Sequence, residues 1–356
     1  MDAHFQVNKI IFDYFSFTIK DITPEEMISL LGFDGITFQL TFGLHGYRSR
    51  YMYDGVSIYW DENRPEVWAE MTGQGCRVYE SYGNGDWFYL CHMVNINENA
   101  QMTRVDIAYD DFNGLLDLVT IRQDVENLSW VSRAKTIKIT NDYRLNDGNI
   151  GSTVMIGDRS SNISCRIYDK AQERNRADEV EHWVRCELQI RHKHADNFIL
   201  YLMSDIETIY GTEIDNNRRL DCLYFAVLNH FIRFIDVNAN DDTNRWRKPC
   251  AEHWQKFIDS YKYQSISLYK SPGVEYNELR LRHTAEEMYG GLIYTYIQLF
   301  GVDELEQNID KKKYKLNKKY EYLIHQHTVS EAEKVSFDSG VAESKETFGV
   351  LTGGQD

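Results

Sequence analysis

Apolar and polar residues alternate along much of the first half of the chain, and this pattern predicts β-strands. A strand directs successive side chains to opposite faces, so a period of two marks one buried and one polar face. The pattern is present at residues 12–20, 67–73, 103–111, 153–159, 163–170 and 183–191. Turn-rich or polar stretches separate these segments, which therefore predict an α+β fold with a mostly antiparallel sheet.

Two local signals add a helix and a hairpin to this region. Thr23 and Glu26 form a capping-box pair around Pro24, and the apolar run that follows stops at Gly32, as at the end of a helix. The Asp-Gly dipeptide at 54–55 separates two tyrosine-rich runs and tolerates the positive φ angles of a type I′ turn. We therefore expect one helix after Thr23 and a β-hairpin around the Asp-Gly pair.

The second half of the chain carries helical periodicity instead. Helix-compatible apolar spacing is present at residues 195–204, 220–236, 249–261 and 284–300. Residues 223–235 are apolar nearly all round, as in a buried helix. The polar residues 236–244 are typical of a surface loop. This half therefore predicts a helical domain.

The C-terminal part changes its charge twice. Six lysines between residues 311 and 319 are interleaved with tyrosines; such a pattern is most often a solvated helix face, with a DNA-binding tail as the alternative. The residues that follow are acidic and poor in apolar periodicity, which predicts disorder. We therefore divide the chain into a sheet-based domain, a helical domain, a basic segment and a disordered acidic tail, with the ranges 1–195, 196–305, 306–327 and 328–356.

Composition narrows the class of protein. Of the 356 residues, 42% are hydrophobic, which suits a folded core, and the net charge of −16 disfavours non-specific coating of nucleic acid. Local binding stays open because residues 131–195 hold 12 basic and 9 acidic side chains, a charge of +3 against −19 for the rest. The six cysteines form no CxxC pair, which argues against a zinc site and against a disulfide framework.

The sequence also bears on location. No apolar run reaches the length of a membrane span, and the start of the chain lacks the basic and apolar regions of a secretory signal. We therefore expect a cytoplasmic protein without a membrane partner.

Four of the predicted strands carry polar side chains at positions of one parity. These positions are Glu70 and Thr72; Arg104, Asp106 and Asp110; Arg166, Tyr168 and Lys170; and Arg185, Glu187, Gln189 and Arg191. Carboxylates on rigid strands can hold Mg²⁺ or Mn²⁺, a tyrosine can act as a nucleophile, and guanidinium groups can offset charge on a phosphate. This set suits phosphoryl transfer. The alternative is a solvated sheet face with weak cross-strand ion pairs, and parity alone favours that alternative.

Longer motifs favour the chemical interpretation. They are TGQGCRVYE (72–80), TRVDIAYDDF (103–112), WVSRAK (130–135), the turn GDRS (157–160), RIYDKAQERN (166–175) and EHWVRCELQIR (181–191). In order and spacing they resemble the replication initiation factor family, which spans rolling-circle plasmid initiators and NicK/MobT-like relaxases of integrative conjugative elements. The resemblance covers residues 40–195, with a weaker likeness at 245–257. One departure is Asp158, where the family often has serine.

The resemblance implies roles for individual residues. Tyr168 corresponds to the nicking nucleophile, and Asp106 and Glu187 correspond to carboxylates that bind a divalent metal, Mg²⁺ or Mn²⁺. Asp110 and Glu70 are further candidate ligands. By the same logic Arg166, Lys170 and Arg185 are expected near the scissile phosphate. The alternative for Asp106 and Glu187 is a structural ion pair with a neighbouring arginine.

The sequence therefore predicts a metal-dependent DNA nickase and strand transferase. It would form a covalent 5′-phosphotyrosine at an origin and initiate rolling-circle replication, conjugative transfer or both. Expected partners are origin DNA in duplex and single-stranded form, a host helicase and a second copy of the chain. Two alternatives stay open: a non-catalytic initiator that binds an origin and recruits a helicase, and a structural or carbohydrate-contacting β-protein, which would fit the 13% aromatic content.

Overall fold

We describe a computed structural model of the chain. It covers residues 7–145, 148–158, 160–204, 218–259 and 289–310, together with the single residues 266, 268, 285 and 324. Within it the chain divides into two compact units, Met1–Pro272 and Gly273–Asp356. The predicted lysine-rich island at 311–319 and the acidic tail at 328–356 lie outside the described residues.

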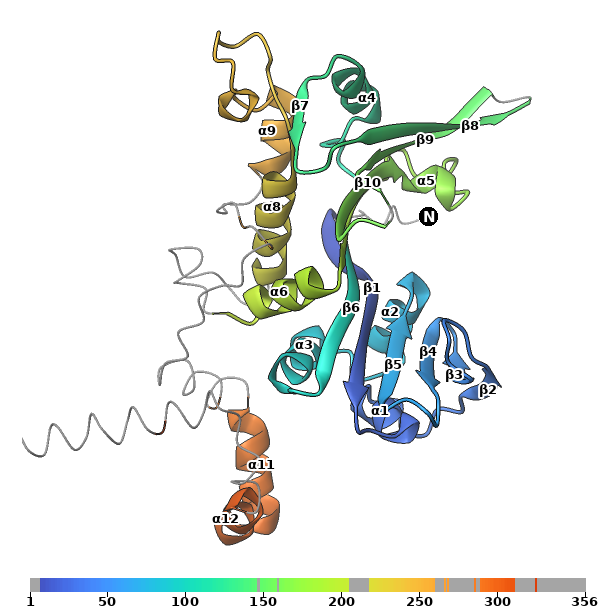
Figure 1. Cartoon of the computed structure of the whole chain (residues 1–356), viewed down its shortest axis with the longest axis vertical. Helices are drawn as coiled ribbons and strands as arrows, with labels where there is room; N and C mark the ends of the chain where they lie inside the picture. The colour runs from blue at the N-terminus through green and yellow to red at the C-terminus, as the bar shows by residue number, and fades with distance from the viewer. Residues whose placement is uncertain are drawn as a thin grey trace, which may run out of the picture. The chain divides into compact units, whose positions relative to one another are not determined.

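The first unit is built on a ten-stranded sheet in which every neighbouring pair is antiparallel. The strand order is β2-β3-β4-β5-β1-β6-β11-β10-β9-β8 (Figure 1). The strands are β1 (Lys9–Lys20), β2 (Gln39–Phe42), β3 (Ser49–Tyr53), β4 (Val56–Trp60), β5 (Glu66–Met71), β6 (Ala100–Asp111), β8 (Ile137–Arg144), β9 (Gly148–Ile156), β10 (Ile163–Asp169) and β11 (Val184–Arg191). A separate two-stranded sheet pairs β7 (Trp130–Ser132) with β12 (Ile232–Phe234). The predicted α+β class with an antiparallel sheet is confirmed.

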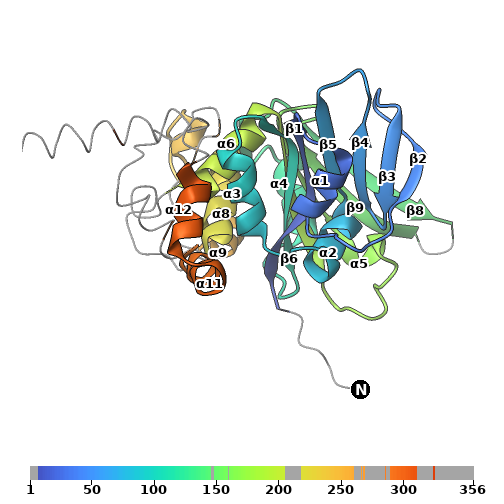
Figure 2. The ribbon, with the colours of Figure 1, turned by 90° about the horizontal axis from the view of Figure 1, so that it is seen from below.

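Helices cover the apolar side of this sheet. The described helices of this unit are α1 (Pro24–Leu30), α2 (Gly73–Tyr82), α3 (Trp87–Ile96), α4 (Leu118–Glu126), α5 (Lys170–Glu173), α6 (Lys193–Leu202), α8 (Arg219–Phe231), the 3-10 helix η2 (Arg245–Arg247) and α9 (Glu252–Ile258). Helices α1 and α2 contact β4 and β5, while α3 and α6 contact β6 (Figure 2). Buried apolar side chains of the strands and of these helices form one continuous cluster. One face of the sheet is thereby left for polar side chains.

Aromatic packing fixes α8 and α9 on the sheet. The Tyr224 hydroxyl of α8 donates to the Cys186 carbonyl oxygen of β11 at 2.8 Å. Tyr109 of β6 meets Phe225 and Phe257 edge to face, with ring centroids 5.6 and 5.2 Å apart. Helices α6, α8 and α9 consequently belong to the same compact unit as the sheet. The domain boundary after residue 195 stays a prediction.

The local signals produce the expected elements. The Thr23 side chain accepts from the Glu26 backbone N–H at 3.2 Å, and the Glu26 carboxylate accepts from the Thr23 N–H at 2.7 Å, so the capping box is present. Asp54 and Gly55 have φ angles of 35° and 86° between β3 and β4, as a type I′ turn requires. The helix and the hairpin are confirmed, as is the loop at 236–244. All six cysteines are free.

Four further helices of the first half, α2, α3, α4 and the one-turn helix α5, were not expected from the sequence. Helix α2 begins after the Thr72 N-cap, but two glycines interrupt its apolar spacing. Helix α3 is apolar on nearly every side, which hides its periodicity, and α4 is short with one buried residue, Ile121. Another difference concerns residues 220–236, where the helix ends at Phe231 and the chain continues as β12. There the β-branched and aromatic side chains pair with β7 instead of extending the helix.

The second unit contains α11 (Gly290–Phe300) and α12 (Val302–Asp310) among the described residues. Gly301 joins them with a φ of 86°, a conformation that favours glycine. The Tyr296 hydroxyl donates to the Glu304 carboxylate at 3.3 Å and accepts from the Asn308 amide at 3.2 Å. These contacts hold the two helices together. Among the described helices of both units, none combines the length and apolar character needed to span a bilayer.

Candidate active site

Antiparallel pairing brings the polar positions of five strands onto one face. Asp106 of β6 lies opposite Tyr14 of β1 and opposite Gln189 of β11. Arg166 of β10 lies opposite Glu187 of β11. Opposed residues in a ladder point to the same side of the sheet. This shared polar face carries Glu70, Tyr14, Arg104, Asp106, Asp110, Arg185, Glu187, Arg166 and Tyr168.

Tyr168 lies in a network of charged groups on this face. Its hydroxyl donates to Glu187 Oε2 at 3.2 Å and accepts from Lys170 Nζ at 3.2 Å. The Arg166 guanidinium lies over the phenol ring, 4.5 Å from its centroid, and donates to both Glu187 oxygens at 3.0 and 2.8 Å. Tyr168 is 4% exposed. Burial and the Glu187 charge raise the pKa of the Tyr168 hydroxyl, so the phenol is protonated at neutral pH.

Lys170 connects this network to α5. Its ammonium forms an ion pair with Glu173 at 2.8 Å and is buried. Burial lowers its pKa, and the nearby Arg185 charge lowers it further. The lysine is therefore held within bonding distance of the phenol oxygen, where its charge stabilises any negative charge on that oxygen.

Asp106 and Glu187 are the two buried carboxylates at the centre of the face. Arg104 binds Asp106 with Nε at 2.8 Å and Nη2 at 2.5 Å. Burial raises the pKa of Asp106 to about 6; Arg104 opposes this shift, and the Glu187 charge adds to it. The two carboxylates are 2% and 4% exposed. They are close enough to repel each other, and each is compensated by one partly exposed arginine.

These carboxylates fit a small divalent cation by donor type. Mg²⁺ prefers oxygen ligands and is often held by one or two carboxylates, with water and substrate phosphate as its other ligands. A cation would also relieve the repulsion between Asp106 and Glu187. In the part of the chain that the structure describes, no group of three or more His, Cys, Asp or Glu side chains gathers closely enough to hold a metal ion. Asp106 and Glu187 would then supply two protein ligands to a bound cation.

A second tyrosine on the face was not singled out from the sequence. The Tyr14 hydroxyl donates to Glu70, and the Arg104 guanidinium lies 4.1 Å from the Tyr14 ring centroid. This repeats the arrangement of Tyr168 with Glu187 and Arg166. Glu70 accepts another hydrogen bond from the Tyr59 hydroxyl at 2.9 Å. The alternation along residues 12–20 carried the signal, since Tyr14 belongs to its polar parity.

Asp110 and Arg185 form a separate buried ion pair. Arg185 donates to Asp110 through Nε at 2.7 Å and Nη2 at 2.8 Å, and its Nη1 approaches Asp13 Oδ2 at 2.7 Å. The Trp183 indole N–H also donates to Asp110 at 2.8 Å. Asp13 reaches this pair because the register of β1 shifts between residues 12 and 14. Asp110 is thus enclosed by donors, and Arg185 by two carboxylates.

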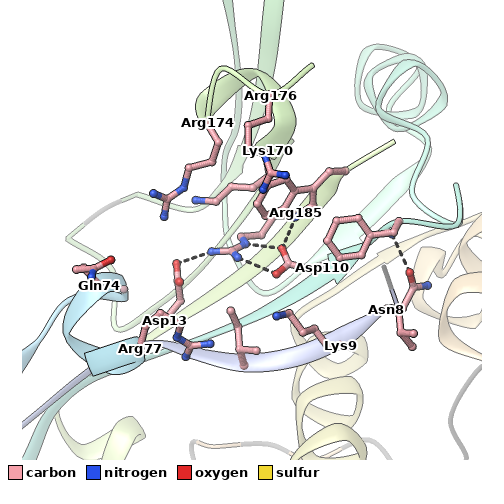
Figure 3. Close-up of a pocket in the computed structure, with 15 residues that line it drawn as sticks. Asn8, Lys9, Asp13, Gln74, Arg77, Asp110, Lys170, Arg174, Arg176 and Arg185 are labelled. Carbon is pink, nitrogen blue, oxygen red and sulfur yellow. Dashed lines mark hydrogen bonds and ion pairs between the residues drawn. The ribbon is translucent and has the colours of Figure 1, made fainter. Parts of the chain in front are cut away.

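Two further findings concern the motifs. Asp158, which departs from the family pattern, forms an ion pair with Lys138, and this cation offsets the added negative charge. A cavity of about 660 Å³ lies beside the Arg185 pair, and Lys170 is among its lining residues (Figure 3). Because Lys170 lines the cavity and also contacts the Tyr168 hydroxyl, the cavity adjoins Tyr168.

Comparisons with known proteins agree with this architecture. A family model described as "Replication initiation factor" matches residues 100–294, and one described as "Rolling Circle replication initiation protein N-terminal domain" matches residues 9–91. A Bacillus subtilis (strain 168) protein named "Putative DNA relaxase NicK" is 25% identical over 231 residues, which are 61% of this chain and 60% of that protein. The chain thus spans less than two thirds of that relative.

A solved structure has a similar fold. The rolling circle replication initiator protein from Geobacillus stearothermophilus matches with a TM-score of 0.63 at 24% identity, covering 73% of this chain and 99% of that one. The model match over residues 100–294 is more than half of the chain and includes β6, β10 and β11. The chain therefore belongs to the replication initiation factor family.

Proposed function

We propose that this protein cuts and rejoins one DNA strand at an origin, and so initiates rolling-circle replication, conjugative transfer or both. Tyr168 is the nucleophile in this proposal. The observation that supports it best is the contact of its hydroxyl with Glu187 and Lys170, both at 3.2 Å. Membership of the replication initiation factor family supports it further.

In the proposed reaction the Tyr168 oxygen attacks the phosphorus of one phosphodiester. The bond from phosphorus to the 3′ oxygen breaks, and the departing oxygen takes a proton from water, which leaves a 5′-phosphotyrosine and a 3′ hydroxyl. The phenol proton must leave as the new bond forms, and the nearest carboxylate acceptor is Glu187. Lys170 would stabilise the negative charge that develops on the phenol oxygen. Reversal by a 3′ hydroxyl rejoins the strand without an external energy source.

The other polar residues take supporting roles in the proposal. Asp106 and Glu187 would hold Mg²⁺ or Mn²⁺, which neutralises charge on the phosphate when bound. Arg166 is 35% exposed and lies over the ring, so it can turn to the scissile phosphate. Arg185 already faces two carboxylates and would act by positioning. Asp110 is a weaker ligand candidate because its partner Arg185 is buried, whereas the partners of Asp106 and Glu187 are partly exposed and can turn away. Glu70 is the other candidate ligand, and it accepts from two tyrosine hydroxyls.

The partners follow from the reaction. Origin DNA would be bound as duplex and as single strand, and a host helicase and a second copy of the chain stay predictions. A cytoplasmic location is proposed on the same basis, since the substrate is DNA of the cell or of a mobile element.

The test is a nicking assay with two tyrosine variants. The full chain is incubated with supercoiled plasmid that carries the element's own origin, with Mg²⁺ or Mn²⁺. Open circles and a covalent protein–DNA adduct are expected from the unmodified chain, and Tyr168→Phe should form neither. Tyr14→Phe is the matched control, because Tyr14 also contacts a glutamate and lies under an arginine on the same face.

Each other outcome rejects a part of the proposal. An adduct that survives in Tyr168→Phe and disappears in Tyr14→Phe would move the nucleophile to Tyr14. Origin binding without any nick would favour the non-catalytic initiator. Absence of DNA affinity even at low salt would favour a structural β-protein.

A further inference from the structure

The cavity next to Tyr168 concentrates positive charge in an acidic protein. Its lining includes six cationic side chains and two carboxylates, an excess of four positive charges, whereas the whole chain carries −16. The cations are Lys9, Arg77, Lys170, Arg174, Arg176 and Arg185, and the carboxylates are Asp13 and Asp110. Both carboxylates are already engaged by Arg185. Four of the other cations pair with glutamates that do not line the cavity: Arg77 with Glu80, Lys170 and Arg174 with Glu173, and Arg176 with Glu179.

These cations come from separate parts of the chain. Lys9 begins β1 and Arg77 belongs to α2, while Lys170 belongs to α5 and Arg174 and Arg176 follow it. Figure 3 shows Lys170 and the two arginines on one side of the cavity, with Arg77 and Lys9 across from them. Like charges on opposing walls repel one another, and an anion bound between them would relieve that repulsion.

Arg174 and Arg176 are held so that their terminal nitrogens stay available. Arg174 contacts Glu173 through Nε at 3.3 Å, and Arg176 contacts Glu179 through Nε at 2.8 Å. No contact described for either residue uses the terminal Nη groups. A guanidinium fixed at Nε presents two NH₂ groups in a planar fork, which suits phosphate oxygens.

The rest of the lining suits a larger ligand than phosphate alone. Val7, Ile11, Phe112 and Trp183 form an apolar part of the wall. The rings of Phe112 and Trp183 pack with centroids 5.4 Å apart, and the Trp183 indole is fixed by Asp110 at 2.8 Å. The volume of about 660 Å³ is in the range of small-molecule sites. An aromatic wall beside a phosphate-binding wall matches a base joined to its phosphate.

We propose that this cavity binds one nucleotide of the cut DNA strand, next to the scissile phosphate, with Arg174 and Arg176 on its phosphate. The link to the reaction rests on the proposed function. Lys170 lines the cavity and also donates to the Tyr168 hydroxyl at 3.2 Å, so a bound nucleotide lies one side chain from the nucleophile. The cavity thereby positions the strand for attack.

The test measures binding apart from nicking. All proteins are the full chain carrying Tyr168→Phe, without divalent cation, and a fluorescent single-stranded thymidine oligonucleotide reports binding by anisotropy at several salt concentrations. The combined variant R174Q/R176Q should bind roughly tenfold or more weakly. The slope of log affinity against log salt should fall by about 0.7 for each phosphate that the variant no longer neutralises. R247Q is the matched control, because Arg247 is 71% exposed, pairs with one aspartate and lies outside the cavity lining.

Competition separates the sources of the ligand. Thymidine monophosphate should displace the oligonucleotide weakly, and inorganic phosphate more weakly still. If thymidine monophosphate and inorganic phosphate displaced the oligonucleotide equally well, the aromatic wall would not bind the base and the proposal of a nucleotide site would be rejected. Loss of monophosphate binding with unchanged oligonucleotide binding would assign the cavity to free nucleotides and overturn the proposal. Unchanged affinity and salt slope in R174Q/R176Q would overturn it as well.

Two controls keep the result interpretable. If the combined variant melts early, the single variants R174K and R176K keep the charge and remove the fork, and each should still weaken binding relative to R247Q. An unmodified chain that binds through the cavity but forms no adduct with origin plasmid would reject the proposed function and leave the cavity assignment standing.

Discussion

Replacing Asp110 by asparagine tests whether this carboxylate is a structural counter-ion. Asp110 is 1% exposed and Arg185 is 3% exposed, so neither charge is shielded by water. The Asp110 carboxylate accepts two hydrogen bonds from Arg185 and one from Trp183. Asparagine keeps the shape and one acceptor oxygen, but it removes the negative charge and replaces the other oxygen with a donor facing a guanidinium.

The expected cost follows from burial. Removing one partner of a buried ion pair leaves an uncompensated charge, which typically costs about 3–5 kcal/mol. Asp13 still faces Arg185 at 2.7 Å and keeps part of the compensation. We therefore expect a loss of about 3 kcal/mol in the free energy of unfolding. A fall of about 6–12 °C in melting temperature corresponds to that loss in a unit of this size.

The measurement is urea unfolding followed by tryptophan fluorescence, with melting followed by circular dichroism. Asp242→Asn is the control, since its partner Arg247 is 71% exposed and the two groups are 3.7 Å apart. An exposed pair contributes about 0–1 kcal/mol, so the control should unfold like the unmodified chain. A loss below about 1 kcal/mol for Asp110→Asn would refute the reasoning, because the buried pair would then behave like an exposed one.

Other positions give further predictions. Burial raises the pKa of Asp106 to about 6, above its unfolded value of about 3.9, so the folded state loses stability as the pH rises between those values. Asp106→Asn should remove that slope, which in the unmodified chain amounts to up to roughly 3 kcal/mol of unfolding free energy between pH 4 and 7 in urea titrations. Plots of unfolding free energy against pH that run parallel for the two proteins would contradict this. The hydrogen bond to Asp111 raises the pKa of His182, so its stabilisation is complete below about pH 6.5 and is lost as the pH rises through the raised pKa. His182→Gln should therefore lower the free energy of unfolding more at about pH 5.5 than at pH 8.5. An equal loss at both pH values would show that the His182–Asp111 ion pair does not stabilise the fold. A Cβ at Gly75 would lie 2.2 Å from the Gly55 oxygen, so Gly75→Ala should cost about 1–3 kcal/mol. Gly291→Ala meets no heavy atom within 4 Å and should leave melting unchanged or improved.

Much of the fold could be predicted from local patterns. In β1, β6, β10 and β11, successive side chains face apolar and polar surroundings in turn. Apolar and polar residues therefore alternate along the sequence, and this pattern can be read without knowing the fold. The capping box at Thr23 and the Asp-Gly turn depend on neighbours within four residues. Helices α2 and α3 were missed for the opposite reason. Two glycines interrupt the apolar spacing of α2, and α3 is apolar on nearly every side, so a regular apolar stripe marks neither helix.

The candidate site was only partly visible in the sequence. Tyr168, Asp106 and Glu187 were predicted as site residues, each from the sequence motif of the strand that carries it. Tyr14 belongs to a strand without a recognised motif, and Asp13 reaches Arg185 only through a register shift in β1. The pairing of Asp110 with Arg185 joins two strands far apart in the chain, so alternation along either strand could not specify it.

The sequence by itself determined several of the strands, the polar face of each of these, and the family that the motifs belong to; it did not indicate β2, β7, β8 or β12. These properties depend on the order of side chains along the backbone. Only the tertiary structure decided that the polar faces coincide, that arginines cover the central carboxylates, and that cations from β1, α2 and α5 line one cavity. The physical reason is that strand order and register join residues distant in sequence, and local periodicity carries no information about which strands become neighbours.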